Sequence, residues 1–291
     1  MRRPDLRTLY KETLKSDAFY SDELINVLLL RPIAAVFVWL VYPTSLTPNQ
    51  VTLLAIAAGF ASAYAYGMGT SAAIAAGGML IVLKDILDDA DGQLARAKRL
   101  YSRRGRFLDS LGDVAVNIAV FGAITLAVHR IHTNAFTIWF GILSLIGITL
   151  RVSYHVYYQA SFLHRQNRYE LNRISEEVTD EDMSGDAAAL RLQRWFQLIY
   201  GWQDRLMLRI DRWCRGETFD ETHLPVWYSD RLGLRLSGLM GFGTEYALLA
   251  FCSWFNALDG YFLLNVFLMN GIWLSSVLYR RLVLSKNLSS G

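Results

Sequence analysis

Four aspartates are the residues of this chain whose types and spacing best suit chemistry. Asp88 and Asp91 are three positions apart, and Asp109 and Asp113 are four positions apart. Side chains at these spacings share one face of a helix, so the two members of each pair point together. Crowded carboxylates repel one another, and divalent cations remove that repulsion. Because no His or Cys is nearby, the oxygen ligands favour hard ions such as Mg²⁺, Mn²⁺ or Ca²⁺ over zinc.

Small residues and one arginine accompany the aspartates. Gly92 and Gly105 remove side chains where a phosphate-bearing ligand must come close, Ala95 lets helices approach, and Arg96 offers a cation. This combination predicts a pyrophosphate site at which two divalent cations stabilise a phosphate during in-line displacement. The fourth carboxylate is then free to take the proton of an attacking hydroxyl. We assign that role to Asp113, although the residue types alone allow any of the four aspartates.

The composition places these residues in a membrane protein. Of the 291 residues, 53% are hydrophobic and 13% aromatic, yet 19% are charged, which predicts membrane spans together with water-exposed segments. The net charge of +3 is small and the basic residues are scattered, so anionic lipid is a better counterpart than nucleic acid. Cys214 and Cys252 fit no metal-binding spacing, and we expect no disulfide.

Six apolar stretches are long enough to cross a bilayer, for which a helix needs roughly 17 to 25 residues. They run from about Asn49 to Gly67, Ala72 to Lys98, Arg106 to Val128, Ala135 to Ser161, Leu232 to Phe255 and Leu258 to Leu282. The sequence therefore predicts an all-α, polytopic membrane protein with six transmembrane helices. The first aspartate pair then ends the second span and the other pair begins the third, so a short turn brings both pairs into one cleft.

Basic residues lie mostly on one side of these spans. They are Arg2, Arg3, Arg7, Lys11 and Lys15 before the first span, Arg96, Lys98, Arg99, Arg103, Arg104 and Arg106 in the turn between the aspartate pairs, and Arg280, Arg281 and Lys286 in the tail. On the opposite side we find Arg130. The positive-inside rule therefore predicts an integral membrane protein whose active site and both termini face the cytoplasm.

The N-terminal segment contains a further apolar stretch, from Ile25 to Tyr42. Arg31 and Pro32 interrupt it, and a seventh span would make the count odd and break the charge bias. We therefore predict an interfacial amphipathic helix. The resulting organisation is N-terminal cytoplasmic or interfacial helices in 1–48, spans one to four with the aspartates in 49–162, a cytoplasmic amphipathic insertion in 163–230, and spans five and six with the tail in 231–291.

The insertion combines an acidic stretch with amphipathic helices. The acidic residues are Glu176, Glu177, Asp180, Glu181 and Asp182, and apolar residues recur at helical spacing from Leu190 to Cys214. This segment fits a membrane surface or a partner, but a connector that merely covers the catalytic part fits equally well. We interpret Trp195, Trp202, Trp213 and Trp227 as membrane-interface anchors.

The string DDADGQLARAKRLYSRRGRFLDSLGD, which runs from Asp88 to Asp113, resembles the signature of the CDP-alcohol phosphotransferase family. All eight positions of that signature match, the six-span layout is similar to the family's membrane domain, and LTPNQVTLL resembles the segment that enters its first span. The resemblance covers most of the chain except about Leu163 to Asp230.

This resemblance implies a homodimeric membrane enzyme of phospholipid biosynthesis. Such an enzyme uses two divalent cations, Mg²⁺ or Mn²⁺, to move a substituted phosphate from a CDP-linked donor to an alcohol acceptor, and it releases CMP. By the same resemblance, the four aspartates would bind metal, with Asp113 also the general base. Gly92, Arg96 and Gly105 would contact the CDP moiety.

Other polar residues in the spans allow two interpretations each. Arg151 and His155 lie one turn apart in the cytoplasmic half of span four and could hold a donor or acceptor headgroup, although snorkelling explains Arg151 nearly as well. Glu245 in span five suits a neutral or paired structural role slightly better than the acceptor path. We interpret Asn265 and Asn270 as interhelical hydrogen bonders.

Asp85 and Lys84 precede the signature directly. We expect them to form a supporting ion pair, with a metal-binding role for Asp85 as the less favoured alternative.

Two other classes of protein also place carboxylates in membrane helices. A divalent-cation transporter would need them near the bilayer midplane, and an idle scaffold would not need a complete signature. The sequence leaves the substrates open, because the signature serves both kinds of donor, one with the CDP linked to the lipid and one with the CDP linked to the headgroup. Arg151 and the basic turn favour an anionic acceptor slightly.

Overall fold

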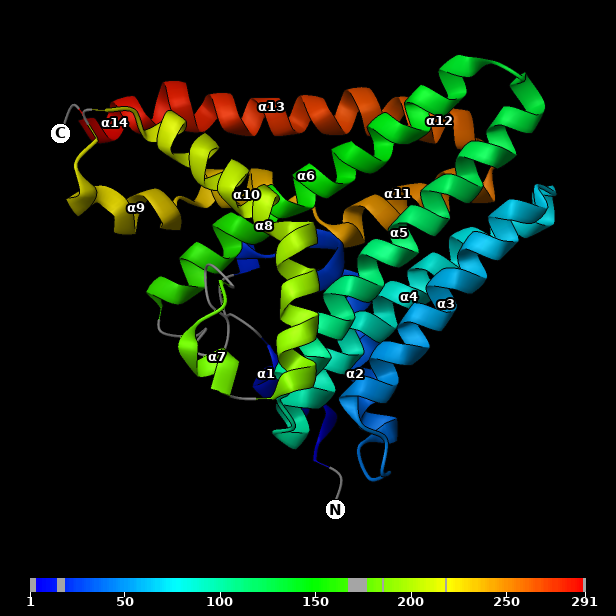
Figure 1. Cartoon of the computed structure of the whole chain (residues 1–291), viewed down its shortest axis with the longest axis horizontal. Coiled ribbons are helices and arrows are strands. Elements are labelled where there is room, and N and C mark those ends of the chain that lie inside the picture. Colours follow the sequence, from blue (N-terminus) through cyan, green and yellow to red (C-terminus); the bar gives the residue numbers. More distant parts are fainter. Residues whose placement is uncertain (1–3, 15–18, 167–176, 185, 218, 290–291) are drawn as a thin grey trace.

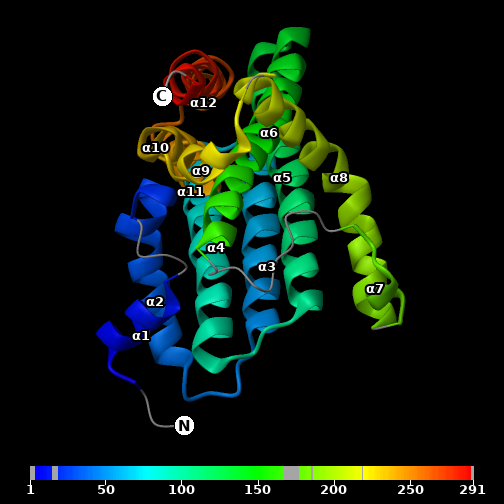
Figure 2. The same ribbon diagram turned by 90° about the vertical axis from the view of Figure 1, so that its left-hand side faces the viewer.

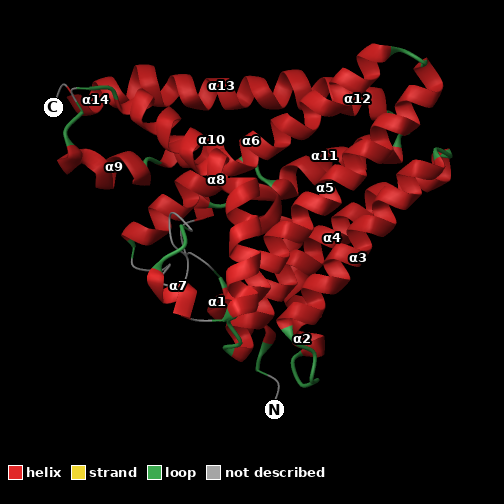
Figure 3. Ribbon diagram, in the orientation of Figure 1, coloured by secondary structure: helices red, strands yellow, loops and turns green. Residues whose placement is uncertain are grey.

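The described residues of this computed structural model are 4–14, 19–166, 177–184, 186–217 and 219–289, and every regular element within them is helical (Figures 1 and 3). The all-α prediction is thus confirmed. The long helices are α3 (Pro48–Met68), α4 (Ser71–Lys98), α5 (Arg103–His132), α6 (Ala135–Arg165) and α8 (Ala187–Arg215). A continuous helical rod ends the chain and consists of α12 (Leu258–Leu263), η4 (Leu264–Met269), α13 (Asn270–Tyr279), η5 (Arg280–Leu284) and α14 (Ser285–Ser289).

The remaining elements are short. They are α1 (Leu6–Thr13), η1 (Phe19–Ser21), η2 (Asn26–Leu30), α2 (Arg31–Val41), α7 (Asp180–Ser184), η3 (Glu221–His223), α9 (Leu224–Ser229), α10 (Arg231–Gly238) and α11 (Phe242–Trp254). Four of the charged residues that support the predicted topology and insertion, Arg2, Arg3, Lys15 and Glu176, lie outside the described residues.

Capping side chains set where the long helices begin. The Thr47 hydroxyl accepts the backbone N–H of Gln50, and the Gln50 side chain accepts the N–H of Thr47, a reciprocal pair that starts α3. Thr70, Ser102 and Asn134 accept backbone N–H groups at the starts of α4, α5 and α6. Short turns therefore join α3 to α6 in succession, and the end of α4 meets the start of α5.

Within the described residues, four helices are long and apolar enough to cross a membrane: α3, α5, α6 and the C-terminal rod from Leu258 to Leu288. They indicate an integral membrane protein. The predicted count of six is not confirmed. The predicted second span, Ala72 to Lys98, is helix α4, but charged residues crowd its second half around Lys84 and Asp91.

The predicted fifth span, Leu232 to Phe255, is wrong as one continuous helix. The chain breaks between α10 and α11, and α11 has 13 residues, or about 20 Å of helix against a hydrocarbon core of about 30 Å. Glycines permit close packing at the break. A Cβ atom at Gly238 would lie 2.8 Å from the carbonyl oxygen of Asp22, and one at Gly241 would overlap the carboxyl group of Glu23. Between α10 and α11, the chain therefore packs against the N-terminal segment and does not continue as a helix.

The predicted interfacial helix, Ile25 to Tyr42, is a short apolar helix from Asn26 to Val41. Ala34 and Val38 of α2 are buried in one cluster with Ala90 and Leu94 of α4. Figure 2 shows α1 and α2 beside α4. The location of the helix from Asn26 to Val41 at a membrane surface stays a prediction.

Helices α3, α4 and α5 lie side by side and form the centre of the molecule (Figures 1 and 2). Close approaches occur where glycines face branched side chains, since a Cβ atom at Gly59 would lie 2.5 Å from Val116. Helix α11 packs on α4, and the hydroxyls of Tyr66 and Ser253 are 2.7 Å apart. This packing holds α4 and α5 in register, and with them the aspartates.

A second core joins the end of α6 to α8, α9, α10 and the C-terminal rod. Trp227 is fully buried there, and its indole N–H donates to Asp211 at 2.9 Å. Its predicted role as an interface anchor is therefore wrong, because its one polar atom has a buried partner. Trp195, Trp202 and Trp213 are exposed. The cysteines are both free and buried, Cys214 in this core and Cys252 in the central one.

Candidate metal centre and active site

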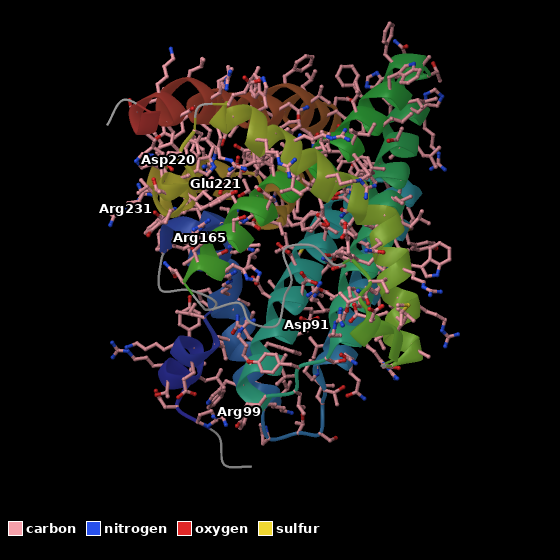
Figure 4. All side chains as sticks on the ribbon, turned by 60° about the vertical axis from the view of Figure 1, so that its left-hand side comes forward. Asp91, Arg99, Arg165, Asp220, Glu221 and Arg231 are labelled. Carbon is pink, nitrogen blue, oxygen red and sulfur yellow. The ribbon has the colours of Figure 1, made fainter. Side chains whose placement is uncertain are left out.

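Three of the four signature aspartates come together between α4 and α5. Ligand oxygens of Asp88, Asp91 and Asp109 all lie within 4.8 Å of one another. Figure 4 shows Asp91 within the helical bundle, with Arg99 below it at the end of α4. The predicted spacing explains this geometry, because α4 presents its pair on one face and the short turn returns α5 alongside it. Three oxygen donors at this separation fit a hard divalent cation.

Asp113 lies beside this trio, but its closest partner is a lysine. The Lys84 ammonium pairs with Asp113 Oδ1 and lies 3.6 Å from Asp88 Oδ1. Lys84 is fully buried, and its ammonium also lies 5.6 Å from the centre of the Tyr246 ring. One buried cation thus links both helices of the candidate metal centre.

The predicted ion pair between Lys84 and Asp85 is therefore not the principal one. Adjacent residues point about 100° apart on a helix and do not face each other, whereas positions four apart do. The spacing of Lys84 and Asp88 was the available signal, and it was missed.

Thr52 is a second site residue that the sequence analysis missed. The Thr52 hydroxyl donates to Asp91 Oδ2, and the Thr52 hydroxyl oxygen lies 3.2 Å from the carbonyl oxygen of Pro48. The residue belongs to the segment LTPNQVTLL, which begins α3. A hydroxyl that holds one carboxylate oxygen leaves the other free to turn toward a ligand, so α3 helps to orient Asp91.

The other signature residues line the start of this region. Gly92 faces Arg96, since a Cβ atom at Gly92 would lie 3.3 Å from a guanidinium nitrogen. A Cβ atom at Gly105 would overlap Asn49 Oδ1, so this glycine lets the starts of α3 and α5 meet. Arg96 Nε donates to the carbonyl oxygen of Thr13 at 2.6 Å and ties the N-terminal segment to α4. Their contact with a CDP moiety stays a prediction.

Two arginines of the basic turn are paired with the insertion. Arg103 forms an ion pair with Asp182 of α7, and Arg104 forms one with Asp186 at the start of α8. A hydrogen bond from the exposed Arg104 lowers the pKa of Asp186 to about 2. These charges therefore serve to dock the insertion on α5.

Helix α8 continues this docking along α5. The Tyr200 hydroxyl donates to the carbonyl oxygen of Ser110 at 2.8 Å, and the rings of Phe107 and Phe196 are 5.4 Å apart. Burial, with the charges of Asp113 and Asp109, raises the pKa of Tyr200. The insertion thus covers the part of α5 that carries the aspartates, as one of the two sequence-based interpretations predicts.

Arg151 lies inside the bundle, where it is fully buried. Its guanidinium is 2.9 Å from Glu245 Oε2 and donates to Asn270 Oδ1 at 2.6 Å. Gly147 gives it room, because a Cβ atom there would lie 2.6 Å from a guanidinium nitrogen. Snorkelling to the surface does not occur, and substrate binding by Arg151 would require it to leave this pair.

Glu245 has further partners around Arg151. Tyr261 donates to its Oε1 at 3.0 Å, and the amide of Asn265 donates to the same oxygen. The interhelical role predicted for Asn265 and Asn270 is thus confirmed. The pairing with Arg151 could have been foreseen, since buried membrane charges of opposite sign usually meet.

His155 lies apart from this network and faces the N-terminal segment. Its Nε2 is 4.0 Å from Glu23 Oε1, while Gln159, one turn further on, donates to Asp22 at 3.0 Å. The structure thus separates Arg151 and His155, which the sequence analysis grouped as one candidate site. Figure 4 also shows Arg165, Asp220, Glu221 and Arg231 gathered at an edge away from Asp91.

Comparison with known proteins bears on the same residues. Residues 45–168 match the sequence model of the CDP-alcohol phosphatidyltransferase family. The chain is 34% identical over 94 residues to the "Bifunctional IPC transferase and DIPP synthase" of Archaeoglobus fulgidus and 36% identical over 93 residues to the protein of that name from Aquifex aeolicus. Each match covers 32% of this chain and 18% and 20% of the respective relative. The chain thus spans about a fifth of the length of these relatives.

Proposed function

Because residues 45–168 match the sequence model of the CDP-alcohol phosphatidyltransferase family, we propose that this protein is a CDP-alcohol phosphotransferase of phospholipid biosynthesis. It moves a substituted phosphate from a CDP-linked donor to an alcohol and releases CMP. One observation carries the proposal. The oxygens of Asp88, Asp91 and Asp109, all within the matched range, lie within 4.8 Å of one another, as a site for hard cations requires.

Asp88, Asp91 and Asp109 would hold divalent cations, Mg²⁺ or Mn²⁺, and Asp113 would complete a site for two of them. When bound, these cations would neutralise the pyrophosphate and stabilise negative charge at the reacting phosphorus. The protein contributes the positions of the carboxylates. Thr52 holds Asp91, and Lys84 holds Asp113 against Asp88 across α4 and α5.

Asp113 is the proposed general base. The acceptor hydroxyl oxygen attacks the phosphorus distal to cytidine, and its proton passes to Asp113. A new phosphorus–oxygen bond forms as the bond to the bridging oxygen of the pyrophosphate breaks. The bridging oxygen and its electron pair leave with CMP. Gly92, Arg96 and Gly105 line the proposed approach of the CDP moiety, and the glycines keep side chains out of its way.

Helix α8 supports the proposed location at a cytoplasmic membrane surface. Trp195, Leu198 and Trp202 project from one face and are 58%, 69% and 46% exposed. Exposed arginines, including Arg191 and Arg205, share that face. Aromatic side chains with arginines suit the interface of an anionic membrane. The proposed organisation keeps 163–230 as a cytoplasmic insertion, with both termini on that side and a homodimer in the membrane.

The direct test uses the purified chain with separate panels of CDP-lipids and CDP-linked headgroups, each offered several alcohols in Mg²⁺ or Mn²⁺. CMP release should occur with one panel and stop on chelation. Asp113→Asn should lower kcat by roughly 10²- to 10⁴-fold, the usual contribution of general acid–base catalysis. Asp259→Asn, in an exposed pair with His132 at the other end of α5, is the matched control.

Three results would contradict the proposal. Activity that survived exhaustive chelation would exclude the metal-dependent mechanism, and near wild-type turnover by Asp113→Asn would remove that residue as the base. Metal flux into proteoliposomes without nucleotide, together with no CMP release from any donor, would identify a transporter instead.

A further inference from the structure

A second set of carboxyl groups lies on another side of α4 and faces the N-terminal segment. Asp85 and Asp89, one turn apart on α4, and Asp22 and Glu23 of the N-terminal segment form what we call the acidic cluster. Arg31 joins its two halves, because it pairs with Asp22 and its Nε is 3.4 Å from Asp89 Oδ1. Asp85 lies one turn before Asp89 on the same face of α4, which places it in the same group.

Negative groups outnumber cations in this cluster. Among the described residues, the Arg31 guanidinium contacts two of its four carboxyl groups, and His155 Nε2 lies 4.0 Å from Glu23 Oε1. Lys84 is adjacent but is held by Asp113. Burial, with the charges of Asp22 and Asp89, raises the pKa of Glu23 to about 8. Even with Glu23 protonated, the cluster offers an excess of hydrogen-bond acceptors.

Two acceptor atoms, one in the acidic cluster and one on Asn26 beside it, are buried with no hydrogen-bond donor. Asp85 Oδ2 has no partner, and Asp85 is 4% exposed. Asn26 Oδ1 also has none, and Asn26 is 8% exposed. Gly243 shows that Asn26 and Glu23 meet, because a Cβ atom there would overlap Asn26 Oδ1 and lie 3.1 Å from Glu23 Oε2. An unsatisfied buried acceptor is destabilising, so a ligand that supplies hydrogen-bond donors would be stabilising.

The position of the cluster connects it with the reaction. Asp85 precedes Asp88 by three residues, or about 4.5 Å along the helix axis, and Asp89 follows Asp88 directly. A ligand held by Asp85 is therefore about one helical turn from the proposed metal centre. The N-terminal segment that closes this side lies before residue 45, outside the matched family domain.

We propose that the acidic cluster is the subsite for the polar-alcohol half of the reaction, and that Asp85, Glu23 and Asn26 bind its hydroxyl or ammonium hydrogens. This inference rests on the proposed function and deepens it. The ligand is a polyol or an amino alcohol, because both are rich in donors and neither adds negative charge. It arrives either as the free acceptor of a CDP-lipid or as the headgroup of a CDP-linked donor.

The paired charges elsewhere agree with this choice. Arg151 is held by Glu245, and Arg103 and Arg104 are held by the insertion. Three of the cations that favoured an anionic acceptor in the sequence thus have internal partners. The acidic cluster therefore favours a neutral or cationic alcohol over the phosphorylated acceptor that the sequence slightly favoured.

The experiment compares wild type with Asp85→Asn and Glu23→Gln in two arms. One arm supplies a CDP-lipid with free glycerol, myo-inositol, ethanolamine or L-serine, and with sn-glycerol 3-phosphate for comparison. The other supplies CDP-linked forms of these alcohols with a diacylglycerol. In the arm that is active, both variants should raise KM for the substrate that carries the polar alcohol by roughly 3- to 10-fold, the range expected for the loss of a neutral hydrogen bond. KM for the other substrate should stay within about twofold.

Asp259→Asn serves as the control, because it changes an exposed carboxyl group at the far end of α5. Unchanged KM in both variants would overturn the proposal. So would equal rises for both substrates, or efficient use of sn-glycerol 3-phosphate with no use of the uncharged alcohols.

Equilibrium dialysis of radiolabelled alcohols against the full-length protein provides a test that needs no turnover. Wild type should retain one of the uncharged or amino alcohols at millimolar concentration, and Glu23→Gln should retain less. If no donor releases CMP but this binding is seen and is weakened by the variant, the proposed function fails and the subsite stands. If CMP is released but the alcohol binds both proteins equally, the subsite fails and the proposed function stands.

Discussion

Two groups of buried charges lie among the apolar helices, and they differ in how far their charges are balanced. Arg151 and Glu245 form a one-to-one pair, to which Asn265, Asn270 and Tyr261 add hydrogen bonds. The metal centre instead brings together three carboxylates, and its adjacent cation, Lys84, is shared with Asp113. Both groups carry the same kinds of residue, so residue type alone does not distinguish them.

The difference separates a structural role from a functional one. A buried charge is costly unless it is paired and hydrogen-bonded, and Arg151 has its counter-ion within the chain, although its Nε has no hydrogen-bond partner. The three carboxylates of the metal centre do not have such balanced pairing, which is the reason for the proposed cation binding. Charge left over after internal pairing is therefore a better guide to function than burial of charge itself.

The largest expected effect comes from removing one carboxylate of the unbalanced group. Asp109→Asn should lower CMP release by at least roughly 10²-fold, because a bound metal contributes several kcal/mol to transition-state stabilisation. It should also abolish the rise in thermal midpoint that Mn²⁺ produces in wild type, since a ligand stabilises only the state that binds it. Activity assays and thermal scans with and without Mn²⁺ measure both effects. A variant that kept the full Mn²⁺ shift would place the metal elsewhere.

Next in size is the effect of breaking the balanced pair. Glu245→Leu should destabilise the protein by about 3–5 kcal/mol, because it leaves a buried arginine without its counter-ion. The double variant Arg151→Met with Glu245→Leu should recover much of that loss. Unfolding in detergent, monitored by circular dichroism, provides the measurement.

The same scans test the comparison through the sign of the change. In the absence of metal, Asp109→Asn should raise the thermal midpoint by removing repulsion, whereas Glu245→Leu should lower it. If both variants lowered the thermal midpoint by similar amounts, the negative charges of the aspartates would be neutralised within the protein, and the comparison would fail.

A smaller effect is expected from pH. Burial raises the pKa of Glu23 to about 8 from an ordinary value near 4.5. The folded protein therefore holds a proton that the unfolded chain has released, and its free energy of unfolding should fall as pH rises from about 5 to 8. Glu23→Gln should flatten this dependence in metal-free scans. Asp186→Asn should leave the slope unchanged, because the pKa of Asp186 lies far below this window.

The smallest effect should come from an exposed pair. Arg104 and Asp186 are linked at the surface, and water screens such pairs strongly. Arg104→Ala should leave the thermal midpoint within the scatter of replicate scans. A large decrease would show that docking of the insertion depends on this contact.

The sequence was sufficient to predict the parts of the site that depend on local spacing. Helical periodicity places Asp88 and Asp91 together, and capping residues confine the turn that brings Asp109 to them. The contact of Lys84 with Asp88 was missed because neighbours in sequence were given more weight than the helical repeat, and its closer contact with Asp113 depends on how α5 packs against α4. Thr52 was missed because its role depends on how α3 packs against α4, which no local pattern reveals.

The missed break in the predicted fifth span has a different cause. The range from Leu232 to Phe255 is apolar and reads as one helix, and its glycines are compatible with that reading. The break exists because Asp22 and Glu23 pack against Gly238 and Gly241. A contact between residues more than 200 positions apart cannot be deduced from the composition of either segment.

The contact between Glu23 and the start of α11 also forms late during synthesis of the chain. Glu23 accepts the backbone N–H of Gly243 at 2.8 Å, across 220 residues of sequence. At a synthesis rate of about 5–20 residues per second, tens of seconds pass between the appearance of the two partners. Glu23 therefore acquires this native contact only after the residues up to Gly243 have been synthesised. A chain that ends before Gly243 contains the four carboxyl groups of the acidic cluster but lacks the hydrogen bond that holds Glu23 beside the break between α10 and α11.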